Sequence, residues 1–410
     1  MGKPKIRFKG FDNDWEQRKL GEICSRIQGN DGRMELPILT ISAGNGWMKQ
    51  EDRFSGNIAG KEQKNYTLLK KGELSYNHGN SKLAKYGTVF SLQTYEEALV
   101  PRVYHSFKIE NGNANFIEYY FATKLPDREL GKLISSGARM DGLLNIGYDD
   151  FMGISLLLPK TQEQNHIAGY FRIFDRLITL HQRKCEDTKK LKKYMLQKMF
   201  PPNGSKVPEI RFKGFTDDWE QRKLENFGKA TGGTSIESEF SEEGVYKVIS
   251  IGSYSENSLY NDQGIRAIKS DKTSNRVLSR NDLTMILNDK TTSGNIIGRV
   301  LLIEESGIYV YNQRTERIEI NVDEYDPVFL YEMLNAPNIR EKIIKQAQGN
   351  TQIYVNWSTI SLLDYMIPSK EEQVKIGEYL HNLSNLITLH QNKCDELKKI
   401  KKYMLQNMFV

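Results

Sequence analysis

The sequence predicts an α+β protein in which two similar α/β domains are joined by two long helices. These helices are expected to form an antiparallel coiled coil with pseudo-two-fold symmetry. Two observations predict this fold class. The 410-residue chain contains the same pair of segments twice in the same order, and the second segment of each pair has the apolar spacing of an amphipathic helix. The segments in between alternate in short runs typical of strands, followed by helix-like stretches.

The first repeated segment opens each half of the chain. Residues 4–20 read PKIRFKGFDNDWEQRKL and residues 208–224 read PEIRFKGFTDDWEQRKL, with 14 of 17 positions identical. The copies lie 204 residues apart, which is too long for a solenoid repeat and indicates a duplicated half-molecule, like a homodimer fused head to tail. Trp15 and Trp219 are expected to be packed anchors where these segments meet the coiled coil or a partner subunit.

Two variable segments, about 21–159 and 225–368, follow the two copies. They share a skeleton, because both contain a Gly-x-Val, at Gly87 and Gly298, and both close with an apolar run and a proline, Pro159 and Pro368. This predicts one fold with two diverged surfaces. Strands are predicted at Pro37–Ser42, Leu74–Asn77, Thr88–Gln93 and Val103–Ile109, then at Tyr246–Ile251, Leu283–Leu287, Gly298–Ile303, Ile308–Tyr311 and Arg317–Ile320. Helices are predicted at Phe116–Lys124, Arg128–Ser135, Pro327–Asn335 and Asn338–Gln346.

The second repeated segment, residues 162–200 and 371–409, is the clearest helix. Both copies contain LITLHQ and end in KKYMLQ-x-MF. One heptad position carries Ile167, Phe174 and later residues, and Leu177 and Leu191 extend the apolar stripe. A helix of about 38 residues is about 57 Å long. Because so long a stripe cannot be buried against one small domain, the two helices are expected to pack on each other.

These segments divide the chain into five parts. The predicted boundaries are a first domain at 1–159, a helix at 160–200, a linker at 201–207, a second domain at 208–368 and a second helix at 369–410.

Composition narrows the functional class. The chain has three cysteines, too few for a disulfide framework, and no run approaches the ~20 apolar residues of a membrane span. The basic N-terminus is followed by no apolar stretch, so we expect a soluble cytoplasmic protein. The net charge of +6 weakly favours an acidic partner such as nucleic acid.

Catalytic and metal-binding motifs are absent from the sequence. It contains no phosphate loop, no HExxH, no paired CxxC and no GxSxG. Its one Pro-Pro pair, at 201–202, lies outside the context of a methyltransferase motif. His181 and His390 lie on the apolar face of the repeated helices, where a core contact is favoured over metal binding. A nuclease would need carboxylates near a lysine, and Asp282, Glu304 and Glu305 have no matching cluster in the first half.

The duplicated IRFKGF-x-x-x-WEQRKL starts and the duplicated LITLHQ…KKYMLQ-x-MF helices bracket two divergent segments. In this order they resemble the DNA-specificity subunit of a type I restriction–modification system, over essentially the whole chain. The resemblance implies two target-recognition domains, each reading one half of a bipartite asymmetric site in double-stranded DNA. It also implies that the coiled coil spaces the domains and docks two modification (methyltransferase) subunits.

The same resemblance implies that this chain is not itself an enzyme. Two restriction subunits, which are ATP-dependent translocases and nucleases, are expected to complete the complex, with no membrane association. The chain is expected to bind no cofactor, whereas S-adenosylmethionine, ATP and Mg belong to the partner subunits. A stand-alone bipartite DNA-binding regulator is the alternative, although residues 24–158 hold 16 basic and 15 acidic residues and are nearly neutral.

Candidate DNA-binding residues come from two polar loops in each variable segment, because Asn, Gln and Arg read base edges and Lys contacts phosphates. The first loop of each segment, 75–85 and 287–295, gives Tyr76, Asn77, His78, Asn80, Lys82 and Lys85, and Asn288, Lys290, Thr291, Thr292 and Asn295. The second loop of each, 135–141 and 348–354, gives Arg139, and Asn350, Gln352 and Tyr354. Candidates for phosphate contact are Arg102, Arg299 and Arg314. A solvated hairpin tip remains the alternative reading of these loops.

Partner docking is predicted for the two repeated tryptophans and for the basic ends of the helices. The candidates are Trp15, Trp219, Lys192, Lys193, Lys401 and Lys402. A solvated helix face or contact with the DNA backbone is the alternative for the lysines.

Overall fold

The computed structural model describes every residue except 1, 55–59, 135–141, 203, 291–292 and 351. The chain divides into two compact units, Met1–His181 with Asn392–Val410, and Gln182–Gln391. Each unit therefore holds one variable domain and one part of each long helix. The predicted boundaries at 160 and 369 mark where each domain ends and its long helix begins along the chain. In the structure, each domain and the helix segments beside it form one compact unit.

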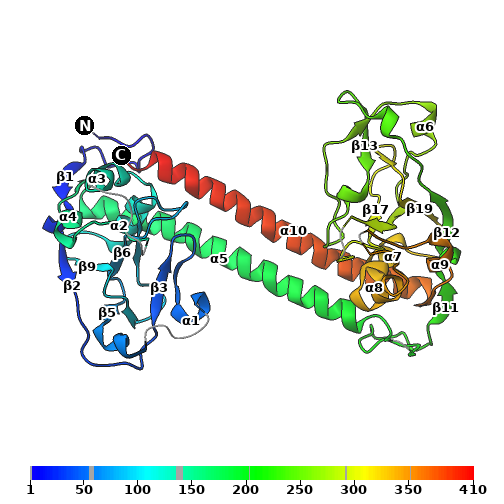
Figure 1. Ribbon diagram of the computed structural model, residues 1–410, viewed down its shortest axis with the longest axis horizontal. Helices are drawn as coiled ribbons and strands as arrows, with labels where there is room; N and C mark the ends of the chain where they lie inside the picture. The colour runs from blue at the N-terminus through cyan, green and yellow to red at the C-terminus, as the bar shows by residue number, and fades with distance from the viewer. Residues whose placement is uncertain (1, 55–59, 135–141, 203, 291–292, 351) are drawn as a thin grey trace. The chain divides into compact units, whose positions relative to one another are not determined.

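The two long helices are α5 (Thr161–Lys198) and α10 (Lys370–Asn407), each of 38 residues (Figure 1). Their contacts run in opposite directions within each unit. In unit 1, the rings of Phe171 and Phe409 lie 5.8 Å apart, and Ile178 further along α5 packs on Cys394 and Leu397. The helices are therefore antiparallel, as the sequence predicts.

Each domain is built on a four-stranded antiparallel sheet with the same connectivity. The order is β2-β9-β6-β7 in unit 1 and β12-β19-β15-β17 in unit 2. Leu74 pairs with Phe107 in the first sheet, and Leu283 pairs with Ile318 in the second. The strands are β2 (Cys24–Ile27), β9 (His105–Ile109), β6 (Leu74–Asn77) and β7 (Thr88–Ser91), then β12 (Gly228–Gly232), β19 (Thr315–Ile320), β15 (Leu283–Ile286) and β17 (Val300–Leu302). The expectation of one fold with two diverged surfaces is confirmed at the level of strand order.

The shared Gly-x-Val motifs have a structural cause. Gly87 and Gly298 precede β7 and β17 and have φ angles of 82° and 67°, which favour glycine. A Cβ at Gly87 would lie 2.6 Å from the Asn77 carbonyl oxygen and 2.6 Å from the Tyr76 ring. Glycine is thus needed at this turn on both conformational and steric grounds.

A second two-stranded ribbon closes each domain next to its long helix. The two copies of WEQRKL each contribute one strand to such a ribbon. In unit 1, β1 (Glu16–Lys19) pairs antiparallel with β10 (Ser155–Leu158). In unit 2, β11 (Glu220–Lys223) pairs antiparallel with β21 (Asp364–Ile367). The sequence predicts neither β1 nor β11, because all four side chains of each strand are exposed and show no apolar alternation.

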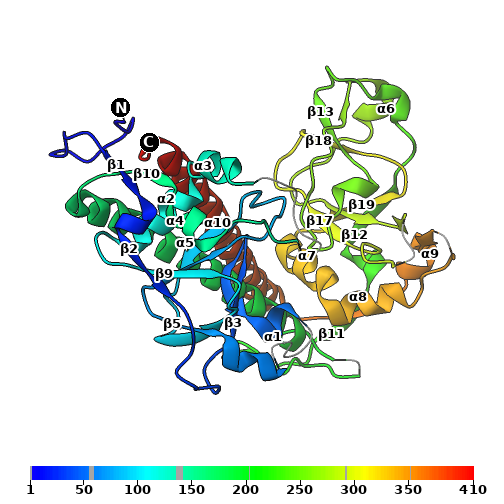
Figure 2. The ribbon, with the colours of Figure 1, turned by 60° about the vertical axis from the view of Figure 1, so that its left-hand side comes forward.

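Smaller sheets and helices complete the domains. In unit 2, α7 (Pro327–Asn335) packs along β17 (Figure 2). The remaining strands are β3 (Leu39–Ser42), β4 (Gly46–Lys49), β5 (Thr67–Lys70), β8 (Glu97–Val100), β13 (Tyr246–Ile249), β14 (Arg266–Ala267), β16 (Asn288–Asp289), β18 (Tyr309–Tyr311) and β20 (Ile353–Tyr354). The other helices are α1 (Gln50–Arg53), α2 (Ala114–Ala122), α3 (Asp127–Lys132), α4 (Tyr148–Met152), α6 (Asp271–Ser274), α7 (Pro327–Asn335), α8 (Pro337–Ile344) and α9 (Trp357–Ile360). The 3-10 turns are η1 (Leu20–Glu22), η2 (Gly60–Asn65), η3 (Leu224–Phe227), η4 (Glu237–Glu239) and η5 (Ile251–Ser253).

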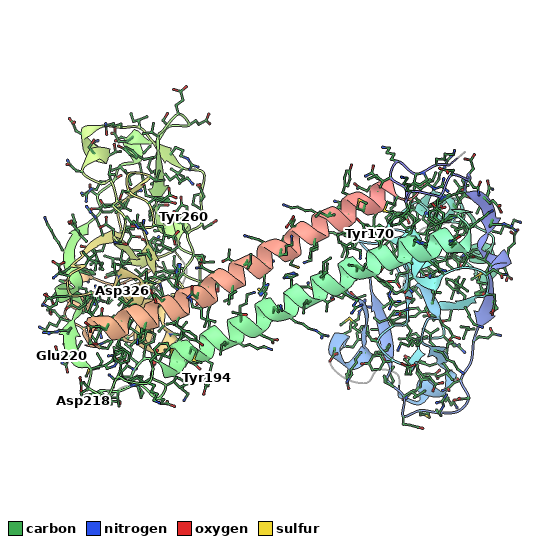
Figure 3. The ribbon with its side chains drawn as sticks, turned by 180° about the vertical axis from the view of Figure 1, so that it is seen from behind. Tyr170, Tyr194, Asp218, Glu220, Tyr260 and Asp326 are labelled. Carbon is green, nitrogen blue, oxygen red and sulfur yellow. The ribbon has the colours of Figure 1, made fainter. Side chains whose placement is uncertain are left out.

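The repeated segments hold each domain onto the helices. Trp15 packs on Phe409 at the end of α10, with ring centroids 6.2 Å apart, and Trp219 packs on Phe200 just after α5, at 6.4 Å. The starts of α2 and α7 are capped in the same way. Asn113 accepts a 3.0 Å hydrogen bond from the Phe116 amide, and Asp326, labelled in Figure 3, accepts one of 2.7 Å from the Phe329 amide. Within the described residues, no helix combines the length and the apolarity that a membrane span needs.

Candidate nucleic-acid interface

The first polar loop of domain 1 pairs with residues 142–144. Gly79 and Leu143 form an antiparallel bridge, and the Asn80 amide donates a 3.0 Å hydrogen bond to the Gly142 carbonyl. The Leu144 amide donates to the His78 carbonyl at 2.9 Å. We call residues 78–80 with 142–144 loop pair 1. Residues 78–80 belong to the first predicted loop, whereas the second predicted loop, 135–141, lies outside the described residues and ends just before residue 142.

Domain 2 has the same arrangement. β16 pairs antiparallel with β20, so that Asn288 lies opposite Tyr354 and Asp289 opposite Ile353. We call residues 288–289 with 353–354 loop pair 2. Both domains therefore join the first predicted polar loop to a second segment by a short antiparallel ladder at the same place in the fold.

Most predicted DNA-binding residues are accessible beside these loop pairs. Tyr354 is 37% exposed, while Asn77, Asn288 and Arg299 are half-buried. Arg139, Thr291 and Thr292 lie outside the described residues. The exposed candidates are Asn80, Lys82, Lys85, Arg102, Lys290, Asn295, Arg314, Asn350 and Gln352.

Two predicted contacts in domain 1 are buried and hold the loops instead. Tyr76 stacks on Phe151 at 4.2 Å and donates a 2.7 Å hydrogen bond to the Tyr86 carbonyl. The ring nitrogens of His78 lie 2.8 Å from the Leu144 carbonyl oxygen and 3.0 Å from that of Val103. Because Tyr76 and His78 are 0% and 6% exposed, their side chains offer no surface for direct DNA contact. Their physical role is to position loop pair 1.

Arg340 positions the first polar loop of domain 2 in a comparable way. The sequence pattern does not predict this role. This buried side chain comes from α8 and donates hydrogen bonds of 3.0 and 2.8 Å to the carbonyl oxygens of Asn295 and Ile297. Burial lowers the pKa of Arg340 to about 10, with a smaller contribution from Arg299. A single arginine in a predicted helix carries no sequence signal for this role, since the contact depends on tertiary packing.

Of the six predicted docking residues, two are buried, two are half-buried and two are exposed. Trp15 and Trp219 are 4% and 2% exposed, which leaves them no surface for a partner and makes them internal anchors. Lys192 donates to Glu332 at 2.9 Å and to Ser384 at 2.6 Å, while Lys401 pairs with Asp175. Only Lys193 and Lys402 of this set are exposed.

A repeated set of exposed apolar residues lies on the two helices. The apolar stripe is narrower than the sequence predicts, because Leu177 and Leu191 are 37% and 40% exposed instead of packed. Tyr194, labelled on α5 in Figure 3, is 49% exposed. We call the full set the exposed helix residues: Leu177, Leu180, Leu191 and Tyr194 on α5, and their repeat equivalents Leu386, Leu389, Ile400 and Tyr403 on α10.

Among the side chains that the structure describes, no three His, Cys, Asp or Glu residues are grouped as metal ligands. Burial raises the pKa of the Cys24 thiol to about 12, which keeps it protonated and unreactive at neutral pH. The polar loop pairs can supply hydrogen bonds and charge to a ligand.

Known proteins share both the sequence pattern and the fold. Residues 216–399 match the family described as type I restriction modification DNA specificity domain. The type I restriction enzyme MjaVIII specificity subunit of Methanocaldococcus jannaschii is 26% identical over 311 residues, which cover 73% of this chain and 71% of that protein. The type I restriction-modification system S subunit from M. genitalium has the same fold, with a TM-score of 0.65 at 14% identity over 99% of both chains. The resemblance and the α+β fold class predicted from the repeats are both confirmed.

Proposed function

Because the chain carries a type I restriction modification DNA specificity domain, we propose that it directs a type I restriction–modification complex to a bipartite, asymmetric DNA site. Each domain reads one half-site through its loop pair. The observation that carries the proposal is that both domains, built on sheets of the same strand order, place a loop pair at the same position, with different residues on it. A duplicated scaffold with two different surfaces suits two different half-sites.

The chain supplies recognition in this proposal, and partner subunits supply catalysis. Methylation would use S-adenosylmethionine in the modification subunits, and cleavage would use ATP and Mg in the restriction subunits. The duplicated exposed helix residues favour this over a stand-alone regulator, since exposed apolar surface marks interaction sites. Their repetition on α5 and α10 suits two copies of the same partner.

Removing two amides of the predicted loop 348–354, next to loop pair 2, tests the recognition role. The structure gives no hydrogen bond within the described residues to the exposed side chains of Asn350 and Gln352. A good bidentate base contact discriminates by about 1–3 kcal/mol, so Asn350→Ala with Gln352→Ala is expected to reduce discrimination at one half-site about 10- to 100-fold. The measurement is competition binding by the complex with duplexes altered in one half-site at a time.

Asn382→Ala removes an exposed amide from α10 and serves as the matched control, with no change expected. Discrimination at the other half-site should also stay unchanged. An equal loss at both half-sites, or no loss at either, would contradict the assignment of loop pair 2 to a single half-site.

Charge placed among the exposed helix residues tests partner docking. Tyr194 and Leu389 both belong to unit 2 and are 49% and 59% exposed. Tyr194→Asp with Leu389→Asp is expected to lower the stoichiometry from two modification subunits per chain to one, because charge in an apolar contact costs several kcal/mol. Native mass spectrometry of the complex measures this directly.

The docking test has a control on the same helix. Asn385→Asp adds one charge at an exposed position that is already polar, and two bound subunits are expected. Two bound subunits in the Tyr194→Asp, Leu389→Asp chain would show that the exposed helix residues are not the docking surface.

A further inference from the structure

A basic hollow of about 690 Å³ lies beside loop pair 1. Its wall includes His78 and Leu143 of the loop pair, His105 of β9, Arg26 of β2 and Arg102. None of its fourteen lining residues is Asp or Glu. Domain 1 is nearly neutral in total charge, so this hollow is a place where the fold sorts positive charge locally.

The two arginines of the hollow are available to a ligand. The guanidinium of Arg26 lies 4.2 Å from the centre of the Tyr148 ring, a cation–π contact that orients it without neutralising its charge. Arg102 is exposed, and no ion pair to either arginine occurs within the described residues. Burial lowers the pKa of His105, whereas the guanidinium groups of the two arginines carry a permanent positive charge.

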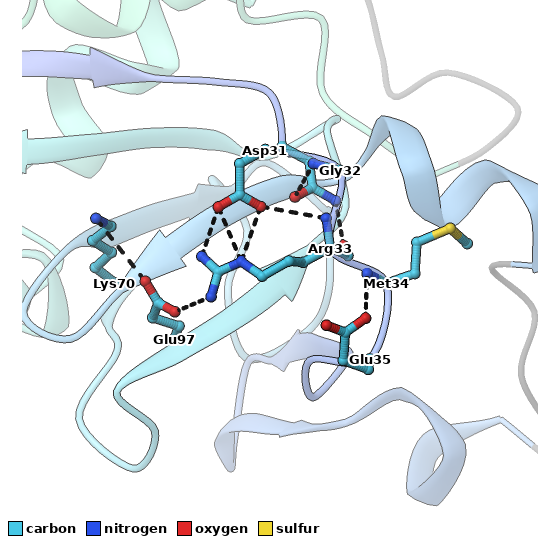
Figure 4. Close-up of polar contacts among 8 residues, drawn as sticks. Asp31, Gly32, Arg33, Met34, Glu35, Lys70 and Glu97 are labelled. Atoms are coloured by element: carbon cyan, nitrogen blue, oxygen red, sulfur yellow. Dashed lines mark hydrogen bonds and ion pairs between the residues drawn. The ribbon is translucent and has the colours of Figure 1, made fainter.

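Another arginine of domain 1 shows the contrasting case. The guanidinium of Arg33 lies between two carboxylates, at 2.7 Å from Asp31 and 2.5 Å from Glu97 (Figure 4). The hydrogen bonds from Arg33 lower the pKa of both carboxyl groups. Arg33 is therefore occupied in holding its loop to β8, whereas Arg26 and Arg102 are not committed to a carboxylate.

Domain 2 has a different chemistry at the equivalent position. Tyr76 pairs with His105 across β6 and β9, and Met285 pairs with Glu316 across β15 and β19, so that Glu316 replaces His105. The Glu316 carboxyl group is buried, and its burial raises its pKa to about 7. The nearby Arg276 donates to the Gly232 carbonyl at 2.6 Å and to the Tyr311 hydroxyl at 3.0 Å. An anion is thus favoured in domain 1 and not at this place in domain 2.

We propose that the hollow of domain 1 binds a phosphodiester group of the DNA backbone next to the half-site that loop pair 1 reads. The inference rests on the proposed function and adds an asymmetry to it. Base contacts are made by both domains, whereas this electrostatic contact belongs to domain 1 alone. Arginine at a phosphate positions the protein on the duplex without reading sequence, so its loss should weaken binding to all sequences alike.

Salt dependence of DNA binding tests the proposal. The logarithm of the affinity falls with the logarithm of the salt concentration by about 0.9 for each phosphate neutralised. In the complex with the modification subunit, Arg26→Ala combined with Arg102→Ala is expected to reduce this slope by about 1, the value for one phosphate, with half-site discrimination unchanged. Arg26→Lys and Arg102→Lys keep the charge and should retain the wild-type slope. Arg18→Ala is the control, since Arg18 is exposed on β1 and paired with Glu16.

Each outcome decides a separate point. An unchanged slope in the chain with both arginines replaced by alanine, together with a wild-type melting temperature, overturns the hollow as a phosphate site. An equal loss of slope in Arg18→Ala overturns it as well, because the effect would then be one of overall charge. If the wild-type complex binds DNA without discriminating the half-sites, the proposed function itself fails, whatever the arginine variants show.

Discussion

Replacing Glu372 by alanine is expected to destabilise unit 2 by about 1.5–3 kcal/mol, because it removes both charge-assisted hydrogen bonds of the half-buried guanidinium of Arg211. Arg211 Nε and Nη2 donate to the two carboxylate oxygens of Glu372 at 2.7 and 2.8 Å, and the Glu372 side chain is 1% exposed. The hydrogen bond that Arg211 donates to the Glu372 carboxylate also raises the pKa of Arg211. Urea unfolding of the full chain, with hydrogen exchange over residues 208–224, measures the effect.

Two further variants separate the ion pair from general damage to the helix. Glu371→Ala changes the exposed neighbouring glutamate and should alter the free energy of unfolding by less than about 0.5 kcal/mol. Arg211→Met with Glu372→Leu replaces both charges with apolar side chains and should recover most of the loss. A loss under about 1 kcal/mol in Glu372→Ala would show that the pair behaves like an exposed one.

Unit 1 repeats the arrangement. Arg7 donates to Glu163 at 2.7 and 2.8 Å, and Glu163 is 3% exposed. Both repeats carry an arginine in the first repeated segment and a glutamate at the start of the long helix. This repeated pattern has a structural cause, because the two side chains form an ion pair in each unit. The repeats are alike because they join the domains to the helices, and the variable segments are free to differ.

Exchanging residues 21–159 for the corresponding segment of a relative with another target is expected to change one half of the recognised site completely. The other half-site and the modification activity should persist, because the second domain and the exposed helix residues are untouched. The exchanged segment ends before the helix and leaves Glu163 in place. Exchanging residues 225–368 instead is the matched control, and it should change only the opposite half-site.

Much of the fold follows from the sequence because the repeats are long and strongly periodic. The predicted strand Leu74–Asn77 and the predicted helix Pro327–Asn335 have the same bounds in the structure. The strands β1 and β11 could not be predicted, since charged, exposed residues show no period of two and their pairing depends on partners about 140 residues away. Leu177 and Leu191 have helical spacing, but a two-helix contact is narrower than the stripe they extend.

The candidate interface is predictable in part. Asn80, Lys290 and Gln352 belong to polar loops between apolar runs, and the structure leaves them exposed. The short ladders within loop pair 1 and loop pair 2 depend on tertiary packing, which the sequence pattern does not show. The burial of Tyr76 and His78 beneath loop pair 1 depends on it as well. Arg26 lies in β2, a strand that the sequence does not predict. The fold is what places Arg26 with Arg102 in one hollow.

The most direct measurement of the central claim is single-molecule sequencing of modified adenines in genomic DNA. Cells would carry the modification subunit with the wild-type chain, with the chain exchanged at residues 21–159, or with no copy of this gene. The account predicts a split motif, a motif changed in one half, and no motif, respectively. An unchanged methylation pattern in cells that lack only this gene, with the modification subunit present and soluble, would contradict it.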